Sequence, residues 1–174
     1  MAQSPLRRTQ ELRLVLALFV TLCFVLILHF VPAARAAIQP LSQLTATISY
    51  VVIQSFGIPV TLDNVVLSHP EGFRFAVDYS CTSLVPGLAI VAVLFFGLSL
   101  SWPQRIIASL TGLLLISLLN HFRLLALYYI GVVEPAAFRV AHDWIGQMLI
   151  VIGTGAIAYY WIDRSTRHGP VRAE

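Results

Sequence analysis

Long apolar runs without a charged side chain are the feature that most limits how this chain can fold. Residues 14–31 form such a run of eighteen residues, directly behind three arginines. A helix of this length is able to cross the hydrocarbon core of a bilayer. Across the chain, 58% of residues are hydrophobic and only 11% are charged, too few to cover a soluble globule of 174 residues. The sequence therefore predicts an all-α integral membrane protein forming one domain over residues 1–174.

Four transmembrane spans are expected, at about residues 14–31, 84–100, 106–131 and 144–162. Seven of the eleven arginines fall on one side of the membrane in this arrangement. They are Arg7, Arg8, Arg13, Arg105, Arg164, Arg167 and Arg172. Because positive charge stays inside, both termini are predicted to be cytoplasmic. A cleaved secretory signal is the alternative for the first span, since residues 34–36 read Ala-Arg-Ala, but the run exceeds the roughly 7–15 apolar residues of a signal.

The outer segment, residues 32–80, is expected to join the first two spans outside the membrane. Residues 41–56 carry no charge and alternate polar and apolar side chains with helical spacing, but sixteen residues are short for a span. This predicts an amphipathic helix on the outer surface or partly embedded. Asn64–Leu67 and Phe73–Val77 read as two short strands around a turn-forming cluster, which predicts a small outer β-hairpin.

Three side chains with reactive chemistry fall at one predicted depth. Cys81 directly precedes the second span, and His142 directly precedes the fourth. Arg123 stands 18 residues beyond Arg105, a helical rise of roughly 27 Å, which reaches the outer boundary of a hydrocarbon core about 30 Å thick. An ionisable residue inside a membrane helix usually marks function. Cationic neighbours such as Arg123 and His142 are expected to lower the pKa of the Cys81 thiol and make it a nucleophile.

Each of these residues also has an ordinary structural explanation. Cys81 alone would be a small buried hydrophobe, Arg123 a side chain reaching the headgroups, and His142 an interfacial polar residue. Asn120 lies one turn before Arg123 and either orients it or bridges helices by hydrogen bonds. His121 is expected to project away from that face. Cys23 lies within the first span, so it is not expected to form a disulfide with Cys81.

Other classes of function are less compatible with the sequence. The basic residues are scattered arginines and form no nucleic-acid-binding patch. A haem or electron-transfer subunit would use His29, His121 and His142, but no C-x-x-C-H motif is present. A metalloprotease using His69, Asp78, Cys81 and His142 lacks H-E-x-x-H and regular ligand spacing. No cofactor or metal is therefore expected, and a membrane assembly protein is the remaining alternative.

The motifs together resemble the exosortase/archaeosortase family of membrane transpeptidases. The resemblance covers roughly residues 44–155. It includes GIPV at residues 57–60, FRFAVDYSC at 73–81, SCTSL at 80–84, the Asn-x-x-Arg from Asn120 to Arg123, and His142 opening the last span. Two features depart from the family: Ser83 replaces a common glycine, and the chain is short, which suggests a compact form similar to exosortase H.

The resemblance implies a cysteine-dependent protease or transpeptidase that acts through a thioester intermediate. Its partners would be secreted proteins with a C-terminal sorting signal, made of a short motif, a transmembrane helix and a basic tail. Cleavage would occur on the outer face of a bacterial or archaeal cytoplasmic membrane. Cys81 matches the family's nucleophile, Arg123 its arginine and His142 its third member, with Asn120 in support.

Overall fold

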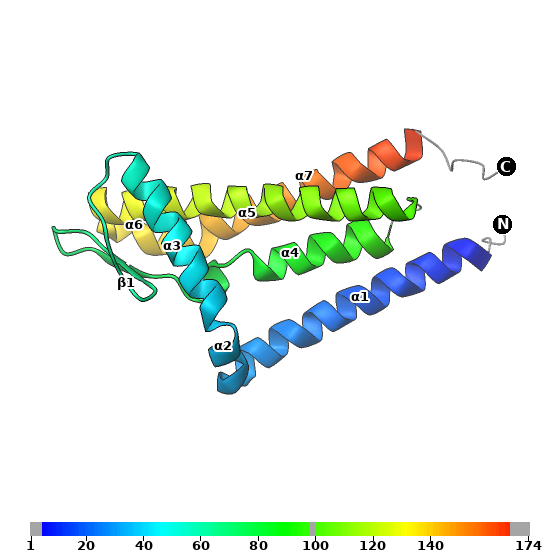
Figure 1. The fold of residues 1–174 in the computed structure, drawn as a ribbon, viewed down its shortest axis with the longest axis horizontal. Helices are drawn as coiled ribbons and strands as arrows, with labels where there is room; N and C mark the ends of the chain where they lie inside the picture. The colour runs from blue at the N-terminus through cyan, green and yellow to red at the C-terminus, as the bar shows by residue number, and fades with distance from the viewer. Residues whose placement is uncertain (1–4, 98–99, 168–174) are drawn as a thin grey trace.

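The computed structural model describes residues 5–97 and 100–167 as an elongated helical bundle with a small sheet at one end (Figure 1). Arg172 and residues 98–99, the latter within the second predicted span, lie outside the described residues. Helices α1 (Pro5–Phe30), α4 (Leu84–Val91), α5 (Trp102–Val133) and α7 (Gly146–Arg167) form the bundle. The beginning of α1 and the end of α7 lie at the same end, opposite the sheet (Figure 1).

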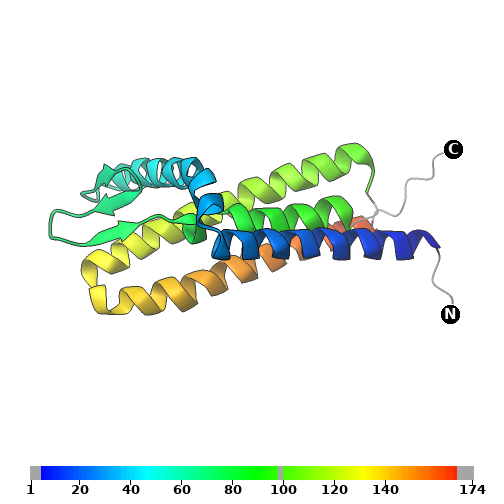
Figure 2. The same cartoon turned by 90° about the horizontal axis from the view of Figure 1, so that it is seen from below.

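Three helical stretches among the described residues are long and apolar enough to cross a membrane. They are Glu11–Phe30, Trp102–Val133 and Pro135–Ser165. The second predicted span, 84–100, is instead a shorter apolar helix over Leu84–Phe96, in which α4 continues into the π-helical turn η2 (Ala92–Phe96). Helix α1 packs against both α4 and η2 (Figure 2). The chain is thus a multi-pass membrane protein.

Two helices begin earlier than the apolar runs from which the third and fourth spans were predicted. Helix α5 begins at Trp102 rather than Ile106, since Ser101 and Gln104 form a reciprocal capping box and Pro103 is accepted in the first turn. The last span was expected from Trp144. The chain is already helical from Pro135, through α6 (Pro135–Val140) and the π-helical turn η3 (Ala141–Ile145) into α7.

The predicted amphipathic helix is α3 (Gln39–Ser55), which follows the short helix α2 (Pro32–Ala37) and crosses the bundle beside α5 (Figure 1). Its buried face is mixed and holds Ser42, Thr45 and Ser49 together with Ala46 and Ile53. Leu44 and Val51 face outwards with more than half of their surface exposed, 55% and 57%. Apolar side chains exposed in this way are typical of a helix that touches lipid.

The sheet has three antiparallel strands in the order β1 (Thr61–Asp63), β2 (Val66–Ser68) and β3 (Arg74–Ala76). Strand β3 falls within the predicted segment Phe73–Val77, and β2 overlaps the predicted segment Asn64–Leu67 but extends to Ser68; the two strands pair with Leu67 opposite Phe75. The sequence analysis did not predict β1, whose short run is followed by Asn64 in the left-handed conformation, with φ of 56°. Asparagine tolerates that conformation, which allows the tight turn into β2.

Two apolar clusters connect these elements. The outer cluster joins α3, the sheet and α5, and it includes Ile53, Leu67, Val77 and Tyr128. The inner cluster joins α4, α5 and α7 through Ile90, Ile116 and Ile150. Cys81 belongs to the outer cluster, so the sheet and the bundle meet at the thiol.

Candidate active site

Cys81 lies at the junction between strand β3 and helix α4. Asp78 caps the 3₁₀ turn η1 (Tyr79–Cys81): its Oδ1 accepts hydrogen bonds from the Ser80 backbone N–H at 2.9 Å and the Ser80 hydroxyl at 2.6 Å. The Ser80 hydroxyl is 3.9 Å from Cys81 Sγ. This turn fixes the direction of a thiol that is only 1% exposed.

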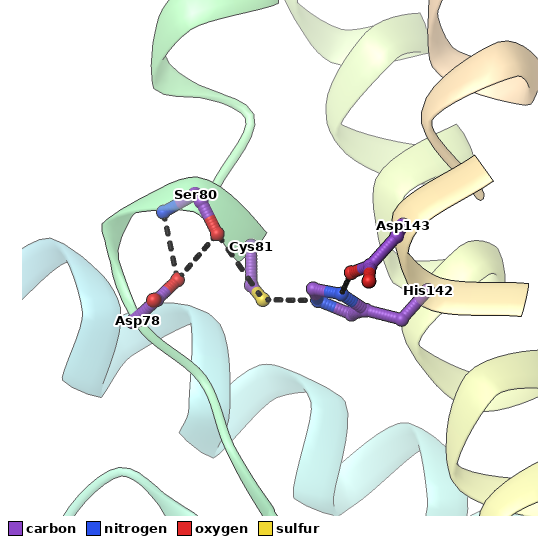
Figure 3. A network of polar contacts seen from close by, with 5 residues as sticks. All are labelled: Asp78, Ser80, Cys81, His142 and Asp143. Carbon is purple, nitrogen blue, oxygen red and sulfur yellow. Dashed lines mark hydrogen bonds and ion pairs between the residues drawn. The ribbon is translucent and has the colours of Figure 1, made fainter. Parts of the chain in front are cut away.

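The His142 ring faces this sulfur from the other side of the site (Figure 3). Its Nε2 is 3.4 Å from Cys81 Sγ, and its Nδ1 is 2.9 Å from Asp143 Oδ1. A carboxylate only accepts hydrogen bonds, so Nδ1 carries the proton and Nε2 presents a lone pair to the thiol. The two residues are adjacent in the π-helical turn η3, a type of distortion frequent at functional sites.

Aromatic rings hold the imidazole in place. The Phe138 ring stacks on His142 at 5.7 Å between centroids, and the Phe75 ring meets it edge-on at 5.9 Å. Phe75 belongs to β3 and Phe138 to α6. The histidine is therefore packed against the strand that leads to the cysteine.

Asn120 connects the cysteine with the arginine. Its Nδ2 donates a hydrogen bond to the backbone carbonyl of Cys81 at 2.8 Å, and its Oδ1 accepts one from Arg123 Nη1 at 3.4 Å. Asn120 and Arg123 are both 2% exposed. The amide donor thus links α5 to η1, and the amide oxygen accepts from Arg123 on the same helix. Asn120 combines the two roles that the sequence left open.

Arg123 keeps unused hydrogen-bond donors. Within residues 5–97 and 100–167, its Nε and Nη2 atoms are buried without a partner. Arg123 and Asn120 line a cavity of about 220 Å³, together with Val25, Ser80, Thr82 and Gln147 among others. Buried donors without a partner are costly, so a charged guanidinium beside a cavity is suited to bind an acceptor group of a ligand.

The thiol is protonated at rest. Burial, and secondarily the Asp78 carboxylate, raise the pKa of Cys81 to about 11, against the smaller opposing effects of Arg123 and the Ser80 hydroxyl. Arg123 lowers this pKa, as expected of a cationic neighbour, but desolvation outweighs the arginine and the net shift is upward. A nearby base is therefore required to generate the thiolate.

His121 and His69 make contacts other than those of this cluster. The His121 Nδ1 is 3.1 Å from the Ser49 hydroxyl, so this side chain faces α3. His69 accepts a hydrogen bond from the Glu71 backbone and contacts the Tyr128 ring. In the part of the chain that the structure describes, no three His, Cys, Asp or Glu side chains gather as metal ligands. Both cysteines are free thiols.

Sequence reasoning missed two contributors to the site. Asp143 was not among the candidate site residues, although its position directly after His142 was a usable signal. The second contributor is Gly146. A Cβ atom at this position would lie 2.6 Å from Arg123 Nε, so glycine leaves the room that the arginine needs. No sequence pattern indicated that contact, because it joins α5 to α7.

The fold and site together define a multi-pass helical membrane protein in which a cysteine and a histidine side chain lie in contact. The family model described as transmembrane exosortase matches residues 8–159, most of the chain. The chain belongs to the transmembrane exosortase family, whose members are sorting-related transpeptidases that act on secreted proteins. Neither the curated proteins nor the solved structures contain a match to it.

Proposed function

We propose that this protein is a cysteine protease or transpeptidase that removes C-terminal sorting signals from secreted proteins. The observation that carries the proposal is the alignment of Cys81 Sγ, the His142 ring and Asp143, with separations of 3.4 and 2.9 Å. This is the nucleophile, base and orienting group of covalent thiol catalysis. Family membership supports the sorting role.

The first half of the reaction forms a thioester. His142 Nε2 takes the thiol proton as Cys81 Sγ attacks the scissile carbonyl carbon, and the carbonyl electrons move to its oxygen. The tetrahedral intermediate then collapses, the C–N bond breaks, and the leaving amine takes the proton from His142. The released part is the tail with its transmembrane helix, and the secreted part remains as an acyl group on Cys81.

The second half transfers the acyl group. Water, or an amine or hydroxyl acceptor, loses a proton to His142 and attacks the thioester carbonyl, and the sulfur leaves as a thiolate that is reprotonated. The free Nε and Nη2 donors of Arg123 are assigned to the oxyanion or the substrate backbone. A preformed charge in a dehydrated site stabilises such an oxyanion strongly.

The proposed location is the outer face of a bacterial or archaeal cytoplasmic membrane. The beginning of α1 and the end of α7 share one end of the bundle (Figure 1). Arginines are concentrated in these two segments of the sequence. The positive-inside rule assigns this end to the cytoplasm, which leaves Cys81 and His142 on the outer side. There they meet a secreted chain whose tail is still in the membrane.

The test is complementation of a deletion strain with wild-type or variant genes, followed by mass spectrometry of the C termini of secreted and membrane proteins. We expect Cys81→Ala and His142→Ala to leave substrates with uncleaved tails, and Cys23→Ser, the matched cysteine control, to process them. Hydroxylamine should release an acyl group from wild-type protein and not from Cys81→Ala. Normal tail removal by inserted Cys81→Ala protein would reject the proposal.

A further inference from the structure

Strand β3 is an edge of the sheet, and its free side leads directly to the cysteine. Its inner side is used by β2: His69 N–H donates to Phe73 O, and Val77 N–H donates to Val65 O, each at 2.8 Å. Backbone groups on an antiparallel strand alternate in direction, so Phe73, Phe75 and Val77 bond towards β2. Those of Arg74 and Ala76 point to the free side.

The residues whose backbone groups point to the free side are exposed. Arg74, Ala76 and Asp78 are exposed, whereas Phe75 between them is 5% exposed. Strand β3 pairs with β2 and with no other strand among the described residues. Asp78 is extended, with φ of −88° and ψ of −174°, so the edge continues to the residue that caps the Cys81 turn. An exposed edge of this kind is a template for one more strand.

We propose that this edge, the backbone of residues 74–78, binds the substrate segment that precedes the scissile bond as an added β-strand. The inference rests on the proposed function and assigns substrate binding to a stretch outside the Cys81, His142 and Arg123 cluster. Main-chain hydrogen bonds in this mode provide affinity for any extended segment, and alternate side chains provide selectivity.

The direction of the added strand follows from the membrane. Strand β3 runs from the tip of the sheet towards Cys81 and α4 (Figure 1). A substrate whose transmembrane helix follows its cleavage site enters the membrane in the same direction, so it pairs parallel to β3. The packing of Phe75 on the His142 ring, with centroids 5.9 Å apart, keeps this strand in a fixed position relative to the base. A substrate aligned on β3 therefore brings its scissile carbonyl to the thiol.

The test removes one backbone donor from the free edge. Ala76→Pro deletes an N–H that points away from β2, a position where an edge strand accepts proline. The control is Ala76→Val, which keeps the N–H and favours a strand. The assay is cleavage of a purified secreted protein whose tail removal in cells requires Cys81. We expect Ala76→Pro to lower kcat/KM at least about tenfold, mainly through KM, because a hydrogen bond is lost and the ring blocks the added strand.

Ala76→Pro protein should keep the wild-type rate of iodoacetamide reaction at Cys81, which shows that the site is intact. Equal cleavage by Ala76→Pro and Ala76→Val would overturn the inference while leaving the proposed function in place. Normal processing by Cys81→Ala would instead reject the proposed function itself.

A second measurement decides the question if Ala76→Pro does not fold. A photo-crosslinking amino acid is placed at Ala76, or at Asp63 on the opposite edge strand β1, in inactive Cys81→Ala protein. We expect the crosslinker at residue 76 to capture the segment preceding the cleavage site, and the one at residue 63 not to capture it. Equal capture at both edges, or capture only at residue 63, would overturn the inference.

Discussion

Gly146 leaves the space that the Arg123 side chain occupies. A Cβ atom on Gly146 would lie 2.6 Å from Arg123 Nε and 3.4 Å from its Cδ, closer to Nε than non-bonded atoms approach. The arginine is thereby held between α5 and the start of α7, with two donors free. The position of Arg123 thus depends on the absence of a side chain on another helix.

Gly146→Ala should displace Arg123 and lower kcat by about a hundredfold, the effect of a displacement of about 1 Å in an active site. Gly155→Ala is the matched control on the same helix, because its Cβ would meet nothing within 4 Å. Alanine favours a helix over glycine by about 1 kcal/mol, so the control should be active and slightly more stable to heat. Full activity of Gly146→Ala would show that Arg123 is not needed in its present position.

Asp143→Leu should lower kcat by about tenfold, because the imidazole loses the acceptor that fixes its tautomer. The kcat of Asp143→Asn should lie between those of Asp143→Leu and the wild type, since the amide oxygen is still able to accept a hydrogen bond from His142 Nδ1–H. The measurement is single-turnover formation of the thioester, which isolates the step in which His142 takes the thiol proton. Identical rates for Asp143→Leu and wild type would exclude a positioning role.

Asn120→Leu should lower the free energy of unfolding by about 1–3 kcal/mol, because the Cys81 carbonyl and Arg123 both lose a buried hydrogen-bond partner. It should also lower activity by displacing the cysteine turn. Ser109→Ala on the same helix should have the opposite effect on stability, since the Ser109 hydroxyl is buried without a hydrogen-bond partner among the described residues. Thermal melting in detergent compares the two, and a stable Asn120→Leu protein would contradict the role given to the amide.

The rate of Cys81 alkylation should rise with pH beyond the range of an ordinary thiol. With a pKa of about 11, the thiolate fraction increases about tenfold per pH unit from pH 7 to 10, without a plateau near pH 9. Asp78→Asn removes a charge that raises this pKa, so its profile should shift to lower pH and its rate at pH 8 should increase. Iodoacetamide kinetics in a Cys23→Ser background measure both, and a plateau near pH 9 would contradict the assignment.

Apolar run lengths and arginine positions were sufficient to predict a multi-pass helical protein and to expect Cys81, Arg123 and His142 near one another, as the contacts through Asn120 and between Cys81 and His142 place them. They were insufficient where local contacts decide the structure. The capping box of Ser101 and Gln104 extends α5 beyond its apolar run, and Pro135 begins a helix where a loop was expected. The pKa of Cys81 is raised, whereas the sequence predicted that it is lowered. The rise comes from burial of Cys81 between the sheet and α5, a tertiary contact that the order of residues does not indicate.

The orientation of α3 also follows from tertiary structure. Its sequence shows two faces. The face that is buried in the structure includes Ser49, which contacts His121 on α5. Neither residue identifies the other by spacing in the sequence. Amphipathicity alone therefore predicts a helix without saying which side touches the protein.

The outward apolar stripe of α3, with Leu44, Ile48 and Val51, has a consequence for how the enzyme meets its substrate. A helix lying across the bundle with such a stripe has its lowest free energy at one immersion depth, where the stripe touches acyl chains and the ends touch headgroups. Since α3 also packs on the sheet, the depth at which α3 lies would fix the depth of Cys81 relative to the lipid. The number of residues between a substrate's membrane helix and its cleavage site should then depend on the depth of α3.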